Sequence, residues 1–104
     1  MQLRQDTILI TGGTSGIGLE MATQLAARGN TVIVTGRDER RLADFRRTHP
    51  SLNAFTVEVT DLASIEELHR QVTAAFPRLN VVINNAGLMQ AIRFPEAAAD
   101  HVAD

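Results

Sequence analysis

The feature that most constrains this chain is a glycine-rich turn between an apolar strand and a helix. The run Thr11-Gly12-Gly13-Thr14-Ser15-Gly16-Ile17-Gly18 directly follows β-branched and apolar residues, and a helical pattern comes after it. Gly12 allows a tight turn, Gly16 has no Cβ to obstruct a ligand, and Gly18 permits close packing of the helix. Free N–H groups and the helix dipole would then face an anion, so the turn predicts a pyrophosphate site.

The spacing of the turn, Gly-x-x-x-Gly-x-Gly, differs from the standard dinucleotide fingerprint and from a P-loop. A P-loop would need Lys followed by Ser or Thr where Leu19 and Glu20 stand. A plain glycine-rich βα turn without a ligand is the competing interpretation. The strand before the turn, the helix after it and the motifs described below favour a ligand site.

Apolar runs alternate with helical patterns along the whole chain. The third run alternates apolar and polar residues, which is typical of a strand at a sheet edge. The order β-α-β-α-β-α-β predicts the α/β class: an incomplete, Rossmann-type doubly wound parallel sheet of four strands in the order 3-2-1-4. Strands are expected at 7–11, 31–35, 54–59 and 81–84, and helices at 17–28, 39–48 and 62–76.

The third predicted helix is expected to be the only one on its face of the sheet, because right-handed crossovers place the first two on the other face. Thr60 or Asp61 can cap it. The fourth strand would have an open edge, which favours self-association through that edge. The helix presents an apolar stripe of Leu62, Ile65, Leu68, Val72 and Phe76.

Composition excludes several functional classes. Cysteine is absent, which excludes disulfides and a thiol nucleophile, and the net charge of −2 predicts no general attraction to nucleic acid or to an anionic membrane. No apolar run approaches the roughly 20 residues of a membrane helix, and the N-terminus lacks a signal-peptide pattern, so we expect a cytoplasmic protein. His49, His69 and His101 are spaced like surface residues, and no metal site is expected.

The end of the second predicted strand bears on the choice of cofactor. NAD-binding units have an acidic residue here, but this chain has Thr35-Gly36-Arg37. A guanidinium suits a 2′-phosphate, so we predict a preference for NADP(H), with NAD(H) possible. A solvated arginine at a loop–helix junction is the competing interpretation. Most neighbouring arginines should lie on the solvent-exposed face of the predicted helix. Arg41 is a lesser candidate for a second contact with a phosphate.

Three motifs together resemble the short-chain dehydrogenase/reductase family, in its N-terminal nucleotide-binding half. They are the turn at 11–18, then Glu58-Val59-Thr60-Asp61, then Asn84-Asn85-Ala86-Gly87. The resemblance extends from about Asp6 to Gly87. It implies that the full-length parent transfers hydride between NADP(H) and an alcohol or carbonyl.

The resemblance also implies roles for single residues. Asn84 would brace the sheet, and the next three residues would lie against the ribose of the cofactor. Glu58 replaces the family's usual Asp near the adenine amino group and is one methylene longer, while Asp61 is more simply a helix cap. The candidate cofactor-binding residues are Gly12, Thr14, Ser15, Gly16, Ile17, Gly18, Arg37, Glu58, Val59, Asn85, Ala86 and Gly87.

The family's catalytic Ser and Tyr-x-x-x-Lys lie further along than this chain reaches, and the chain contains no tyrosine and no lysine. We therefore expect a dinucleotide-binding half-domain at 1–87 and a loosely ordered extension at 88–104, truncated before the catalytic region. No catalytic residue and no activity of the chain alone are expected. A non-catalytic cofactor-binding module and a degenerate scaffold that binds nothing are the alternatives.

Overall fold

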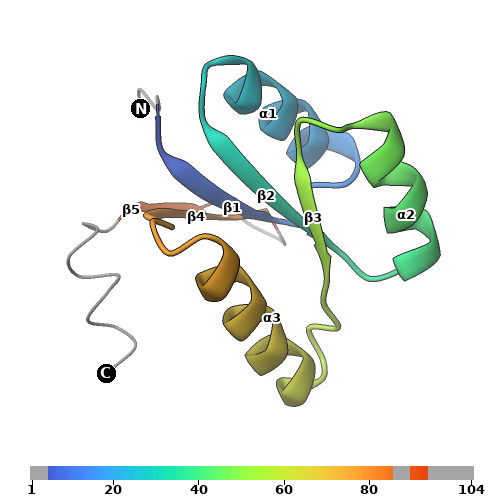
Figure 1. The fold of residues 1–104 in the computed structure, drawn as a ribbon. Coiled ribbons are helices and arrows are strands. Elements are labelled where there is room, and N and C mark those ends of the chain that lie inside the picture. The colour runs from blue at the N-terminus through green and yellow to red at the C-terminus, as the bar shows by residue number, and fades with distance from the viewer. Residues whose placement is uncertain (1–4, 86–89, 94–104) are drawn as a thin grey trace.

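Figure 1 shows an α/β fold in the computed structural model, which describes residues 5–85 and 90–93. Strands and helices alternate as expected through the first four strands, and a fifth strand follows. The strands are β1 (Thr7–Thr11), β2 (Thr31–Gly36), β3 (Asn53–Thr56), β4 (Val81–Asn84) and β5 (Gln90–Arg93). The helices are α1 (Gly16–Ala27), α2 (Glu39–Thr48) and α3 (Leu62–Ala75).

The five strands form one sheet in the order β3-β2-β1-β4-β5. The first four are parallel, which confirms the predicted 3-2-1-4 order, and β3 is an edge strand as its alternation indicated. The fifth strand pairs antiparallel with β4, from Asn84↔Gln90 to Val81↔Arg93. The expectation of an open β4 edge is therefore wrong. The fifth strand was not predicted because the short segment 90–93 shows no strand periodicity in the sequence. The rest of the expected C-terminal extension lies outside the described residues.

Side-chain caps fix the starts of α2 and α3. Asp38 accepts the backbone N–H of Arg40 at 2.9 Å, and Asp61, rather than Thr60, caps α3 by accepting the N–H of Ala63 at 3.0 Å. Each cap satisfies a backbone donor that would otherwise lack a partner in the first turn. Strand β3 ends at Thr56, earlier than the 54–59 run suggested. The residues after it belong to the loop that leads to α3.

The two faces of the sheet are covered unequally. Among the described residues, helices α1 and α2 lie on one face and α3 is the single helix on the other (Figure 1). On the α3 face, the buried core is small: Ile33, Val57, Leu68 and Val72. On the α1–α2 face, the buried strand residues include Ile8, Ile10, Val32, Val34, Val81 and Ile83.

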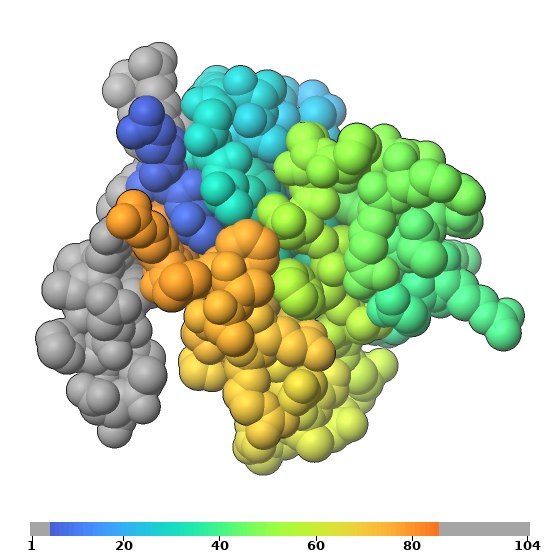
Figure 2. All heavy atoms as spheres, viewed as in Figure 1, coloured from blue at the N-terminus to red at the C-terminus, as the bar shows by residue number. Residues whose placement is uncertain are grey.

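Part of the apolar stripe expected on α3 is in solvent. Leu68 and Val72 are buried, but Leu62 and Ile65 are 68% and 40% exposed. Figure 2 shows why: the first turns of α3, in yellow, project beyond the body of the molecule. The apolar stripe therefore packs against the sheet over only part of its length. No helix in the described part of the chain is long and apolar enough to cross a membrane.

Candidate cofactor-binding site

The carboxyl ends of the four parallel strands meet at one edge of the sheet. Thr11 at the end of β1 pairs with Asn84 at the end of β4, and Gly36 at the end of β2 pairs with Thr56 at the end of β3. In open α/β sheets, ligands bind in the crevice outside these ends. The loops that follow the strands contain most of the residues that the sequence singled out.

The glycines of the first loop perform distinct structural tasks. Gly12 and Gly16 have φ of +68° and +58°, a left-handed conformation that side chains with a Cβ rarely adopt. A Cβ on Gly16 would meet no atom within 4 Å, so this glycine leaves open space beside the backbone. A Cβ on Gly18 would lie 2.5 Å from Asn85 Nδ2 and 2.8 Å from the Gly12 carbonyl oxygen, so only glycine fits there. The expected tight turn and close helix packing are both present.

Gly13 is a further structural requirement that sequence analysis did not single out. A Cβ at this position would lie 2.6 Å from Val34 Cγ1 and 3.3 Å from Ile10 Cγ2. The turn therefore lies directly on the buried side chains of β1 and β2. The second glycine of the Gly12-Gly13 pair was the available sequence signal.

Polar side chains from three strands hold the turn in place. The Gly12 N–H donates to Thr35 Oγ1 at 3.0 Å, and the Asn85 N–H donates to Thr11 Oγ1 at 3.1 Å. Asn85 Nδ2 donates to the Gly12 carbonyl at 3.3 Å, and Thr11 Oγ1 donates to Asn84 Oδ1 at 3.2 Å. Asn84 thus joins β1 to β4, as the resemblance implied, and the Asn85 side chain contacts the glycine-rich turn.

A pocket of about 650 Å³ opens between the turn, the end of β2 and the start of α2. Its volume lies within the range of small-molecule and cofactor sites. Residues predicted from sequence that line it are Gly12, Thr14, Ser15, Arg37 and Glu58. Lining residues that were not predicted as cofactor-binding are Thr35, Gly36, Asp38, Leu42 and Phe45. Arg41, the lesser candidate for a second phosphate contact, also lines the pocket.

The geometry described so far agrees with comparisons against known proteins. The family model for short chain dehydrogenase matches residues 6–104. The chain belongs to the short-chain dehydrogenase/reductase family. The Gly-x-x-x-Gly-x-Gly turn lies within the matched residues.

Relatives of known sequence are considerably longer. An uncharacterized oxidoreductase of Bacillus subtilis strain 168, DltE, is 38% identical over 104 residues, which cover 100% of this chain and 41% of that protein. A (+)-neomenthol dehydrogenase of Capsicum annuum is 35% identical over 88 residues, covering 77% of this chain and 28% of that protein. The chain thus spans less than half the length of these relatives.

A solved structure of the family shows the same fold. The crystal structure of a short chain dehydrogenase from Mycobacterium smegmatis superposes with a TM-score of 0.72 at 29% identity, covering 83% of this chain and 38% of that one. The Rossmann-type sheet of this chain therefore corresponds to part of the fold of that short chain dehydrogenase.

The remaining predicted residues that the structure describes do not line the pocket. Gly16, Gly18 and Asn85 lie at the turn and in its bracing contacts. Ile17 in the first turn of α1 and Val59 in the loop after β3 are 73% and 63% exposed, so two apolar side chains are open to solvent at this edge. Ala86 and Gly87 lie outside the described residues.

Glu58 and Arg37 lie close enough to influence each other electrostatically. Hydrogen bonds from the hydroxyl and the backbone N–H of Thr60 hold the pKa of Glu58 below its usual range, and the positive charge of Arg37 adds to this. The Thr60 hydroxyl donates to Glu58 Oε1 at 2.9 Å, and the Thr60 N–H at 3.3 Å. The Glu58 carboxylate is thus engaged within its own loop.

The α2 residues of the pocket could not have been assigned from the glycine motif. Leu42 and Phe45 follow a helical pattern that equally predicts core packing, and both are buried in the α1–α2 core. The sequence left the role of Thr35 equally ambiguous, because a β-branched residue in an apolar strand also predicts core packing. Only the fold shows that the Thr35 hydroxyl turns to the glycine-rich turn.

Proposed function

We propose that this chain is the NADP(H)-binding portion of a short-chain oxidoreductase whose full-length form transfers hydride between NADP(H) and an alcohol or carbonyl. Members of the family use NAD(P) cofactors. The observation that carries the NADP(H) preference is Arg37, which lines the pocket after β2 and makes no hydrogen bond or ion pair with any described residue. In NAD sites an acidic residue occupies the end of this strand.

The residues present fit a dinucleotide. The open space at Gly16 lets a pyrophosphate approach the backbone at the N-terminus of α1, where free N–H groups and the helix dipole favour an anion. The Ser15 side chain makes no cap hydrogen bond to this helix. Exposed Ile17 and Val59 supply apolar surface for the flat rings of the cofactor. We assign Ala86 and Gly87 to the ribose on the family resemblance alone.

The bound cofactor would supply the hydride, and this chain would bind and orient it. A proton-transferring phenol or amine cannot come from these 104 residues, since they include no tyrosine and no lysine. We therefore propose that the chain by itself binds NADP(H) without turnover, and that the catalytic groups belong to the longer protein. The cytoplasmic location stays a prediction.

Calorimetric titration of the purified chain with NADPH and with NADH tests this proposal. We expect tighter binding of NADPH. Arg37→Ala should weaken NADPH binding by about 1.5–3 kcal/mol, roughly ten- to a hundredfold, and leave NADH nearly unchanged.

Arg40→Ala is the matched control, because it removes the same charge from the same segment at a residue that does not line the pocket. Equal losses of NADPH and NADH affinity in Arg37→Ala would refute the reading of the 2′-phosphate by Arg37. A chain that is folded by circular dichroism but binds neither cofactor would be the degenerate scaffold.

A further inference from the structure

The pocket contains charged groups other than Arg37 and Glu58, the two charged residues that sequence analysis assigned to the cofactor. Four ionisable side chains line it: Arg37, Asp38, Arg41 and Glu58. The two carboxylates already have donors, because Asp38 accepts the backbone N–H groups that begin α2 and Glu58 accepts from Thr60. The two guanidiniums are far less engaged. The pocket therefore contains two guanidiniums whose side-chain donors make no hydrogen bond with the described residues, although its formal charges balance.

Arg41 is held loosely. Its Nε lies 3.8 Å from Asp38 Oδ2, which is beyond hydrogen-bond distance, and 89% of its side chain is exposed. Its terminal guanidinium nitrogens bond to no residue in the described part of the chain. An exposed ion pair of this kind contributes little and can be exchanged for a better anion.

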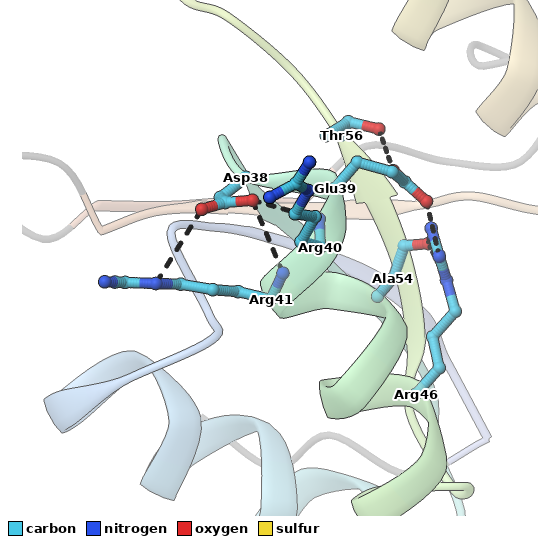
Figure 3. Close-up of polar contacts among 7 residues, drawn as sticks. All are labelled: Asp38, Glu39, Arg40, Arg41, Arg46, Ala54 and Thr56. Atoms are coloured by element: carbon cyan, nitrogen blue, oxygen red, sulfur yellow. Dashed lines mark hydrogen bonds and ion pairs between the residues drawn. The ribbon is translucent and has the colours of Figure 1, made fainter.

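Figure 3 also draws Arg40 and Arg46 of α2, and Arg46 is held differently from Arg41. Arg46 points toward β3, where its guanidinium donates to Glu39 and to the Ala54 carbonyl, while Arg41 extends away on the side of Asp38. Arg47 and Arg70 are each paired with an acidic side chain on their own helix. Arg41 thus combines a place in the pocket with an uncommitted guanidinium.

We propose that Arg41 is a second specificity-determining residue, whose guanidinium binds the 2′-phosphate of NADP(H) together with Arg37. The inference rests on the proposed function. A phosphate monoester carries close to two negative charges and three acceptor oxygens, so two guanidiniums can bind it without competing for the same oxygen. Arg41 belongs to the first turn of α2, and the Asp38 cap fixes the backbone from which its side chain extends.

The test compares Arg41→Ala with the wild-type chain in titrations with NADPH, NADH and 2′,5′-ADP. We expect Arg41→Ala to weaken NADPH and 2′,5′-ADP about three- to tenfold and NADH less than twofold. Arg40→Ala controls for the loss of one positive charge on α2 and should change neither. Arg41→Lys should recover part of the NADPH affinity, because it restores the charge without the planar fork.

The outcomes separate this inference from the proposed function. If Arg37→Ala weakens NADPH selectively but Arg41→Ala does not, Arg41 has no such role and the proposed function stands. Equal weakening of NADPH and NADH in Arg41→Ala would place its contact at the pyrophosphate and overturn the inference. Failure of the folded wild-type chain to bind NADPH would instead overturn the proposed function.

Discussion

The two faces of the sheet differ in how completely their apolar side chains are buried. On the α1–α2 face, Ile8, Ile10, Val32, Val34 and Val81 have no exposed surface. On the α3 face, the apolar strand residues Leu9, Phe55 and Val82 are only half-buried. One helix covers that face, and part of its apolar stripe does not reach the sheet. Within the described residues, one hydrophobic core is therefore complete and the other is partly open.

Polar contacts also hold together the α1–α2 side of the sheet. Helix α2 is tied to the edge strand β3 by Arg46, which donates to the Ala54 carbonyl at 2.9 and 3.2 Å, and by Glu39, which accepts from Arg46 at 2.8 Å and from Thr56 at 2.7 Å (Figure 3). The pocket uses residues of this same helix. The candidate site is thus built mainly on the well-packed face of the sheet.

The largest expected effect compares adjacent residues of β1 that face opposite sides. Ile10→Ala removes a side chain with no exposed surface and should cost about 2–5 kcal/mol of unfolding free energy. Leu9→Ala removes a half-buried side chain and should cost about 1 kcal/mol. Urea unfolding followed by circular dichroism measures both. Similar losses in the two variants would mean that the faces are equally well packed in solution.

The fold was predictable where local pattern and topology agree. The strand at Val32–Val34 is apolar without interruption because it lies between two neighbours and is covered on both faces. Chirality of the crossovers then fixes the strand order. Strand β5 was not predictable, because Gln90-Ala91-Ile92-Arg93 is too short to show a period and forms a strand only by pairing with β4. Burial of the whole apolar stripe of α3 was predicted wrongly for a related reason, because periodicity indicates an apolar face but not what covers that face.

The residues of the candidate site also divide into those that the sequence predicts and those that it does not. Residues of the glycine-rich turn were found from sequence, since the turn needs a backbone conformation that few residues other than glycine adopt. The partners of the turn were less accessible to sequence reasoning. Thr35 and Asn85 contact Gly12 across sequence separations of 23 and 73 residues, and such contacts follow from the sheet register alone.

A smaller effect is expected from the uncovered end of α3. Leu62 and Ile65 are exposed apolar neighbours on its first turns, and an exposed apolar patch favours association between molecules. Leu62→Lys with Ile65→Lys should weaken self-association of the chain roughly tenfold, on the order of 1.4 kcal/mol. Sedimentation velocity at several protein concentrations measures this.

Gln71→Lys is the control for that experiment, because it adds positive charge at an exposed polar position of the same helix. It should leave the association unchanged. A wild-type chain that stays monomeric at all concentrations, or a double variant that associates as the wild type does, would show that the α3 patch is not an association surface.

The smallest effect concerns the polar tie between α2 and β3, and it depends on pH. Hydrogen bonds from Arg46 and Thr56 lower the pKa of Glu39. Because the folded-state pKa lies below the unfolded one, the ionised carboxylate stabilises the fold above the ordinary range of glutamate. That contribution is lost as the pH falls through the lowered value. Glu39→Gln should therefore melt slightly below the wild type at pH 7, and the two curves of melting temperature against pH should converge in acid.

Glu66→Gln is the control, since this exposed α3 carboxylate has no hydrogen bond or ion pair with the described residues. A melting difference for Glu39→Gln that is independent of pH, or equal to that of Glu66→Gln, would mean that the tie does not stabilise the α2 side of the sheet.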